Sequence, residues 1–131
     1  MAALLERLDA GEGLARIVDR PDMLTPHEFA ARLGTAPEEL EELSRAGQVL
    51  CVDGHGRGDL YPAWQVGEDG RPIQGLAEVI AAFPGNAWAA FRFLAQPFEL
   101  LGSETPLDWL RRGEVEHIAV MAGSAARGDF F

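Results

Sequence analysis

The chain has 131 residues and 47% hydrophobic side chains, enough for one compact domain or for two small lobes that share a core. It carries 21 acidic residues and 11 basic ones, all of which are arginine. The resulting net charge of −10 argues against a nucleic-acid-binding function, because such proteins bind mainly by neutralising phosphates. Its apolar runs fall short of the roughly 20 residues that a membrane-spanning helix needs, and the single Cys51 has no partner for an internal disulfide. We therefore expect a cytoplasmic protein that does not contact membranes.

Helix signals begin close to the N-terminus. Leucine, isoleucine and valine residues at helical spacing within residues 4–18 are interrupted by two glycines, which indicates two short helices or one broken helix. Further along, Thr25 precedes Pro26 and stands three residues before Glu28, which is the pattern of a capping box with proline at the first helical position. This predicts a helix that ends where Gly34 follows.

A second helix and a hairpin come next. Thr35 and Pro37 repeat the capping pattern and predict a helix over residues 36–46, which Gly47 stops. The hairpin that we expect after it has a short strand, a glycine-rich turn and a returning strand, at residues 49–52, 53–59 and 60–61. This order of elements resembles the winged helix-turn-helix of excisionase-like and MerR-like regulators.

The resemblance to a winged helix implies DNA binding, but the charges oppose it. The helix that would enter the major groove carries only Arg45 as a cation, beside four carboxylates, those of Glu38, Glu39, Glu41 and Glu42. Carboxylates are repelled by phosphates, and this helix offers no forked side chain of the kind that reads base edges. We therefore expect a scaffold that does not read DNA. A DNA-binding regulator that uses Arg45 and the wing residue Arg57 remains the alternative.

The second half of the chain is dominated by helix signals. Proline and glycine separate four predicted helices, at residues 76–83, 87–95, 106–112 and 115–125. Four of their large apolar residues are predicted to be core: Trp88, Phe91, Leu94 and Trp109. The sequence thus predicts a mainly α fold: a winged-helix-like part with a short β-hairpin over residues 1–70, followed by a small helical bundle with a tail over residues 71–131.

The sequence offers no convincing catalytic or metal site. Cys51, Asp53 and His55 lie close together in the hairpin, but a second pair of ligands is missing. The glycine-rich stretch 54–58 lacks the lysine and hydroxyl of a phosphate-binding loop. We therefore expect no cofactor, no bound metal and no enzymatic activity.

One motif in the C-terminal half resembles a known family. After Trp88 the chain reads Phe93-Leu-Ala-Gln-Pro97 and then Leu100-Leu-Gly-Ser-Glu-Thr-Pro-Leu-Asp-Trp-Leu110. Over about residues 61–122 this is similar to the toxin-binding domain of the Xre/MbcA/ParS antitoxin family. The same residues also have a structural role, because Thr105 and Pro106 form a helix start.

This resemblance implies that the chain neutralises a RES-type toxin, which consumes NAD, by covering its active-site entrance with the antitoxin's C-terminal segment. The partner-binding residues would then be Arg127, Asp129, Phe130 and Phe131, with the small residues before them as a mobile stem. The alternative is that the two phenylalanines pack onto the domain's own core. We also expect a homo-oligomer. A non-catalytic adaptor for another partner remains a further alternative function.

Overall fold

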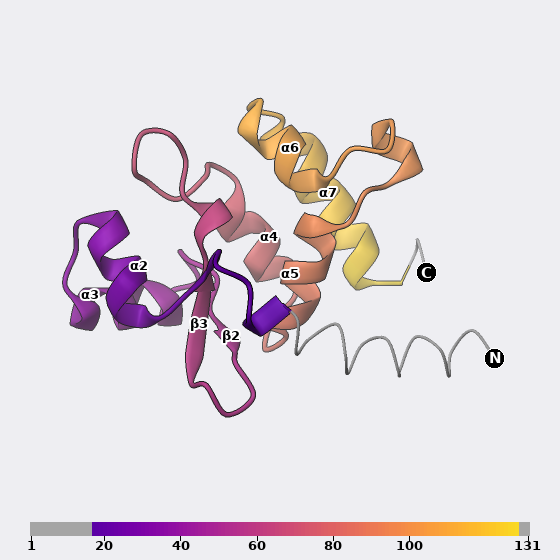
Figure 1. Ribbon diagram of the computed structural model, residues 1–131. Helices are drawn as coiled ribbons and strands as arrows, with labels where there is room; N and C mark the ends of the chain where they lie inside the picture. The colour runs from indigo at the N-terminus through magenta and orange to yellow at the C-terminus, as the bar shows by residue number, and fades with distance from the viewer. Residues whose placement is uncertain (1–16, 129–131) are drawn as a thin grey trace.

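The computed structural model describes residues 17–128 and has a mainly α fold with a short β-hairpin (Figure 1). The first part of this range contains β1 (Met23–Leu24), α2 (Pro26–Leu33), α3 (Pro37–Arg45), β2 (Val52–Asp53), β3 (Asp59–Pro62) and the 3-10 helix η1 (Ala63–Gln65). The second part contains α4 (Leu76–Ala82), α5 (Ala87–Ala95), the 3-10 helix η2 (Glu99–Leu101), α6 (Pro106–Arg111) and α7 (Val115–Ala126). None of the described helices is long and apolar enough to cross a membrane.

Helices α2 and α3 begin in different ways. At the start of α2 the Thr25 hydroxyl accepts a hydrogen bond from the Glu28 N–H, and the Glu28 carboxylate accepts one from the Thr25 N–H, which confirms the predicted capping box. The corresponding prediction for Thr35 was wrong. Ala36 is the N-cap of α3 and supplies no side-chain bond, while the Thr35 hydroxyl donates to the carboxylate of Glu39. The proline of α3 fixes the helix start without a capping side chain.

The small antiparallel sheet has the strand order β1-β3-β2, and sequence reasoning missed β1. Leu24 pairs with Tyr61, and Val52 pairs with Leu60, so β3 lies between the other two strands. A strand of two residues carries no alternation pattern, and its pairing partner lies far along the chain. Strand β2 is also shorter than expected, because it begins at Val52 instead of at residue 49.

The sheet separates two apolar clusters because successive side chains of a strand point to opposite faces. On one face, Tyr61 and Leu24 pack with Phe29 and Leu40 of α2 and α3, and the rings of Phe29 and Tyr61 stack with centroids 5.0 Å apart. On the other face, Leu60 belongs to the main core with the C-terminal helices. The winged-helix-like part is therefore joined to the helical part through the sheet.

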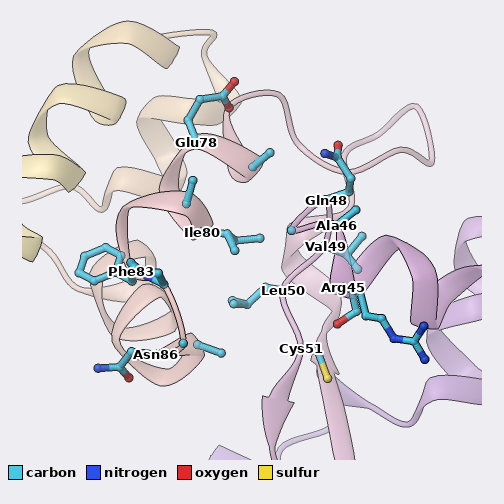
Figure 2. Close-up of a pocket in the computed structure, with 17 residues that line it drawn as sticks. Arg45, Ala46, Gln48, Val49, Leu50, Cys51, Glu78, Ile80, Phe83 and Asn86 are labelled. Atoms are coloured by element: carbon cyan, nitrogen blue, oxygen red, sulfur yellow. The ribbon is translucent and has the colours of Figure 1, made fainter.

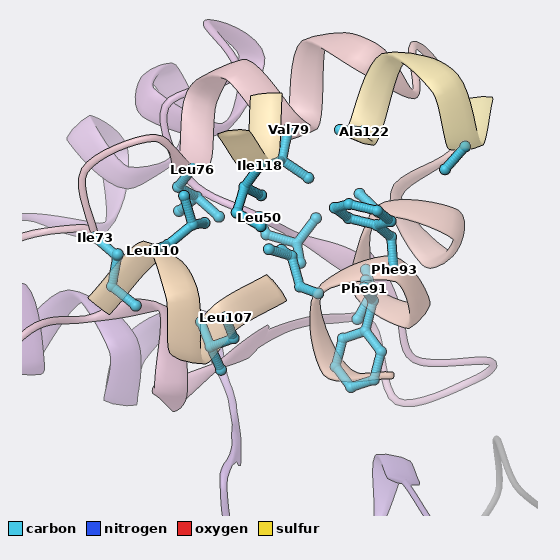
Figure 3. Packing of buried hydrophobic residues seen from close by; sticks show 14 of the residues in the cluster. Leu50, Ile73, Leu76, Val79, Phe91, Phe93, Leu107, Leu110, Ile118 and Ala122 are labelled. Carbon is cyan, nitrogen blue, oxygen red and sulfur yellow. The ribbon is translucent and has the colours of Figure 1, made fainter. Parts of the chain in front are cut away.

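The main core lies between α4, α5, α6 and α7, as the close packing of its side chains in Figure 3 shows. Val79, Leu94 and Ile118 are fully buried there, and Leu50 enters the same cluster from the segment before β2. Residues on both sides of the expected boundary at residue 70 thus share one core. Burial of apolar area at about 25 cal/mol per Å² is the main force that holds the helices together.

The predicted bounds of the C-terminal helices agree closely with the structure. Helix α5 spans the predicted residues 87–95, and the other three helices end within one residue of the expected position. Phe91 and Leu94 are buried as expected, whereas Trp88 and Trp109 are only half-buried. The side chains of these two tryptophans therefore lie at the edge of the core.

Candidate partner-binding surface

The two cations that the alternative, DNA-binding function would use are each paired with a carboxylate. Arg45 Nη2 lies 2.7 Å from Glu41 Oε1 on the same helix, and Arg57 in the hairpin turn forms an ion pair with Asp19. Both pairs are exposed, so each is worth little stability. The carboxylates nevertheless offset the positive charge that a phosphate contact would need, and the neighbouring side chains Glu38 and Glu42 of α3 are exposed acids.

The hairpin turn is held against α5. The indole N–H of Trp88 donates to the backbone carbonyl of Asp53 at 3.0 Å, and the His55 ring stacks on Trp88 with centroids 6.2 Å apart. His55 has a φ of 51°, and its N–H donates to the Asp53 carboxylate, which stabilises this left-handed turn. Trp88, which was expected in the core, thus contacts the hairpin turn and holds it against the helical part.

The motif that resembles the antitoxin family forms a structural helix start. Thr105 and Asp108 make a reciprocal capping box at α6, and Leu107 and Leu110 are buried beneath it. The Trp109 ring is half-buried and is covered by His117, whose ring centroid lies 5.0 Å away. These residues therefore fix the position of α6 on α7.

The predicted tail begins at the end of α7. Of its proposed contact residues, the structure describes only Arg127, which donates from Nη2 to the Ser124 hydroxyl at 3.2 Å. Asp129, Phe130 and Phe131 lie outside the described residues. A shallow groove of ≈ 360 Å³ lies beside this helix end, lined by Phe83, Asn86, Ala89, Arg92, Phe93, Gln96, Ala125 and Ala126.

A second surface was missed by sequence reasoning. Leu100 of η2 is 69% exposed and Val120 of α7 is 72% exposed, and both line one groove along the outer face of α7. We call this the α7 groove, and its lining residues are Leu100, Glu114, Glu116, His117, Val120, Met121 and Ser124. A signal existed in the sequence, because α7 is apolar or small on nearly every side, whereas a surface helix normally has one polar face.

A third groove, of ≈ 680 Å³, lies between the segment after α3 and helices α4 and α5 (Figure 2). Leu50 and Ile80 line it from opposite sides, and Cys51 and Arg45 also contribute to its lining. Burial raises the pKa of the Cys51 thiol, which keeps it protonated and weakly nucleophilic near neutral pH. Within residues 17–128 no three His, Cys, Asp or Glu side chains are grouped as metal ligands.

Comparisons with known proteins bear on the fold. No family model and no curated protein matches the sequence. Among solved structures, the chain is similar to the NMR structure of Rv2175c, with a TM-score of 0.67 and 17% sequence identity. The match covers 82% of this chain and 84% of that chain, so the similarity includes both the winged-helix-like part and the helical part. At this level of identity it establishes the shared architecture alone.

Proposed function

We propose that this chain is an antitoxin-like protein that holds and neutralises a RES-type, NAD-consuming toxin through its C-terminal helices. The observation that carries the proposal is the exposed apolar surface of this part, where Leu100 and Val120 line the same groove. Large exposed apolar side chains that line one groove are typical of a surface that a partner covers. The paired arginines and the acidic α3 favour this function over DNA reading.

In this proposal the C-terminal residues 127–131 provide the inhibitory contact. Residue 127 follows directly from α7, so a partner that covers the outer face of α7 lies close to the point where this segment begins. The aromatic residues Phe130 and Phe131 suit a pocket in the partner, because buried aromatic anchors often dominate interface energies.

The proposal is tested by measuring whether the chain protects the NAD of cells that express the toxin. We expect cells that express a RES-domain toxin encoded beside this gene to keep their NAD and to grow when the full chain is co-expressed. Deletion of residues 127–131 should change the free energy of unfolding by no more than about 0.5 kcal/mol. The same deletion should weaken toxin binding by about 2 kcal/mol or more and abolish protection.

Two results would contradict the proposal. If NAD falls at the same rate with and without the full chain, the chain does not neutralise this toxin. If the truncation lowers the melting temperature strongly, the phenylalanines belong to the protein's own core and do not form the inhibitory contact.

A further inference from the structure

The α7 groove concentrates the exposed large apolar side chains of the described residues. Leu100 and Val120 are the large hydrophobic residues that remain exposed in residues 17–128, and they come from different elements, η2 and α7. Single exposed apolar side chains are ordinary on any protein surface. Two that line one groove are not scattered, and they favour a docking function for this groove.

The groove has an acidic rim. Glu114 and Glu116 line it at the start of α7, and the exposed Glu99 precedes Leu100 in η2. No arginine lines the groove, and the ion pairs found within the described part of the chain do not include these three glutamates. Binding of a partner at this groove is therefore most favourable when the residues that flank its apolar contact are basic.

We infer that the α7 groove binds an amphipathic helix of a partner protein, with apolar side chains between Leu100 and Val120 and with lysine or arginine facing Glu114 and Glu116. This inference rests on the proposed function, because it names the surface and the partner chemistry through which the toxin is held. A second copy of this chain is the less favourable occupant. Its groove would bring the same acidic rim, and each copy carries a net charge of −10.

The inference is tested with two labelled synthetic helices of equal length and the full chain, by fluorescence anisotropy. Both helices carry the same leucine stripe, one with lysine flanks and the other with glutamate flanks. We expect the lysine helix to bind with an affinity that falls as the salt concentration is raised, and we expect the glutamate helix not to bind. Val120→Thr should weaken binding of the lysine helix about tenfold, because it replaces an exposed methyl by a hydroxyl of similar size.

A matched pair of charge reversals separates the groove from the overall charge. Glu116→Lys in the groove and the control Glu38→Lys on α3 change the net charge equally, and both side chains are exposed. We expect Glu116→Lys to weaken binding of the lysine helix at least several-fold more than Glu38→Lys. Melting temperatures of all variants should stay close to that of the wild type, because none of these residues is buried.

Equal effects of the two reversals, or an unchanged affinity of Val120→Thr, would overturn the inference. So would a dimer in sedimentation equilibrium that Val120→Thr dissociates, because the groove would then hold a second copy. If the lysine helix binds as expected but the chain does not protect NAD, the assignment of the α7 groove as a docking site is kept and the proposed toxin partner is wrong. If Val120→Thr protects NAD as well as the wild type does, the toxin is held elsewhere and only the groove assignment fails.

Discussion

The side-chain amide of Gln65 forms a closed pair of hydrogen bonds with the backbone of Leu50. The Leu50 N–H donates to Oε1 of Gln65 at 2.6 Å, and Nε2 of Gln65 donates to the Leu50 carbonyl at 2.8 Å. Gln65 is fully buried, and the two residues are 15 positions apart in the chain. The amide thus satisfies backbone groups that a longer β2 strand would otherwise have paired, which explains why the strand predicted from residue 49 begins only at Val52.

Replacement of Gln65 by leucine should destabilise the fold by about 2–4 kcal/mol, because it leaves one buried N–H and one buried carbonyl of Leu50 without partners. The exposed Gln74 offers a matched control, and Gln74→Leu should change stability by less than about 0.5 kcal/mol. Urea denaturation followed by far-UV circular dichroism measures both. Equal effects of the two substitutions would show that the Gln65 bonds contribute nothing specific.

Two leucines near α7 test the distinction between core and docking surface. Leu110 is 2% exposed and Leu100 is 69% exposed. Leu110→Ala should cost about 2–5 kcal/mol through lost burial and a residual cavity, whereas Leu100→Ala should cost less than about 0.5 kcal/mol. Thermal unfolding of both variants gives the comparison. A stable Leu110→Ala protein would mean that α6 does not pack on the core.

A pair of glycines separates backbone strain from steric clash. Gly75 has a φ of +93°, and an added Cβ there would lie 2.7 Å from Leu110 Cδ2 and 3.0 Å from Val115 Cγ1. Gly113 has a similar φ of +89° but nothing within 4 Å. Gly113→Ala should therefore cost about 1–2 kcal/mol from left-handed strain alone, and Gly75→Ala should cost clearly more. Similar midpoints in chemical denaturation would mean that α4 shifts easily to make room.

The ion pair between Glu104 and Arg112 predicts an acid dependence of stability. The hydrogen bonds from Arg112 lower the pKa of Glu104 below its ordinary value. The pair therefore contributes fully above the unfolded-chain pKa of about 4.3, and this contribution is lost as the pH falls through the lowered pKa of the folded state.

Glu104→Gln should thus lower the melting temperature at pH 7 by a small amount, and this difference should vanish once the pH falls below the lowered pKa of Glu104. The exposed Glu78 of α4 serves as a control, and Glu78→Gln should show no such difference. Melting curves across this pH range give the comparison. A difference that grows towards acid would contradict the assigned sign.

The winged-helix-like part should not bind duplex DNA specifically at physiological salt. The exposed acids of α3 repel phosphates, and Arg45 and Arg57 are already paired with carboxylates. Fluorescence anisotropy with the gene's own promoter fragment measures the affinity. Sub-micromolar binding that depends on sequence would instead favour a DNA-reading regulator.

The sequence by itself determined the features that depend on neighbouring residues. The capping box of Thr25 and Glu28, the helix start at Pro106 and the bounds of α5 follow from contacts within one or two turns of a helix. Such contacts are present wherever these residues occur in order, so periodicity and breakers were sufficient to predict the mainly α fold with its hairpin.

Only the tertiary structure decided what distant residues do together. The pairing of β1 with β3, the burial of Gln65 against Leu50 and the groove that Leu100 and Val120 line each involve elements that are separated along the chain. No local pattern encodes these contacts, because they arise when the helices and the sheet pack to bury a shared core. The same packing moved Trp88 and Trp109 to the edge of the core, although their hydrophobicity alone predicted burial.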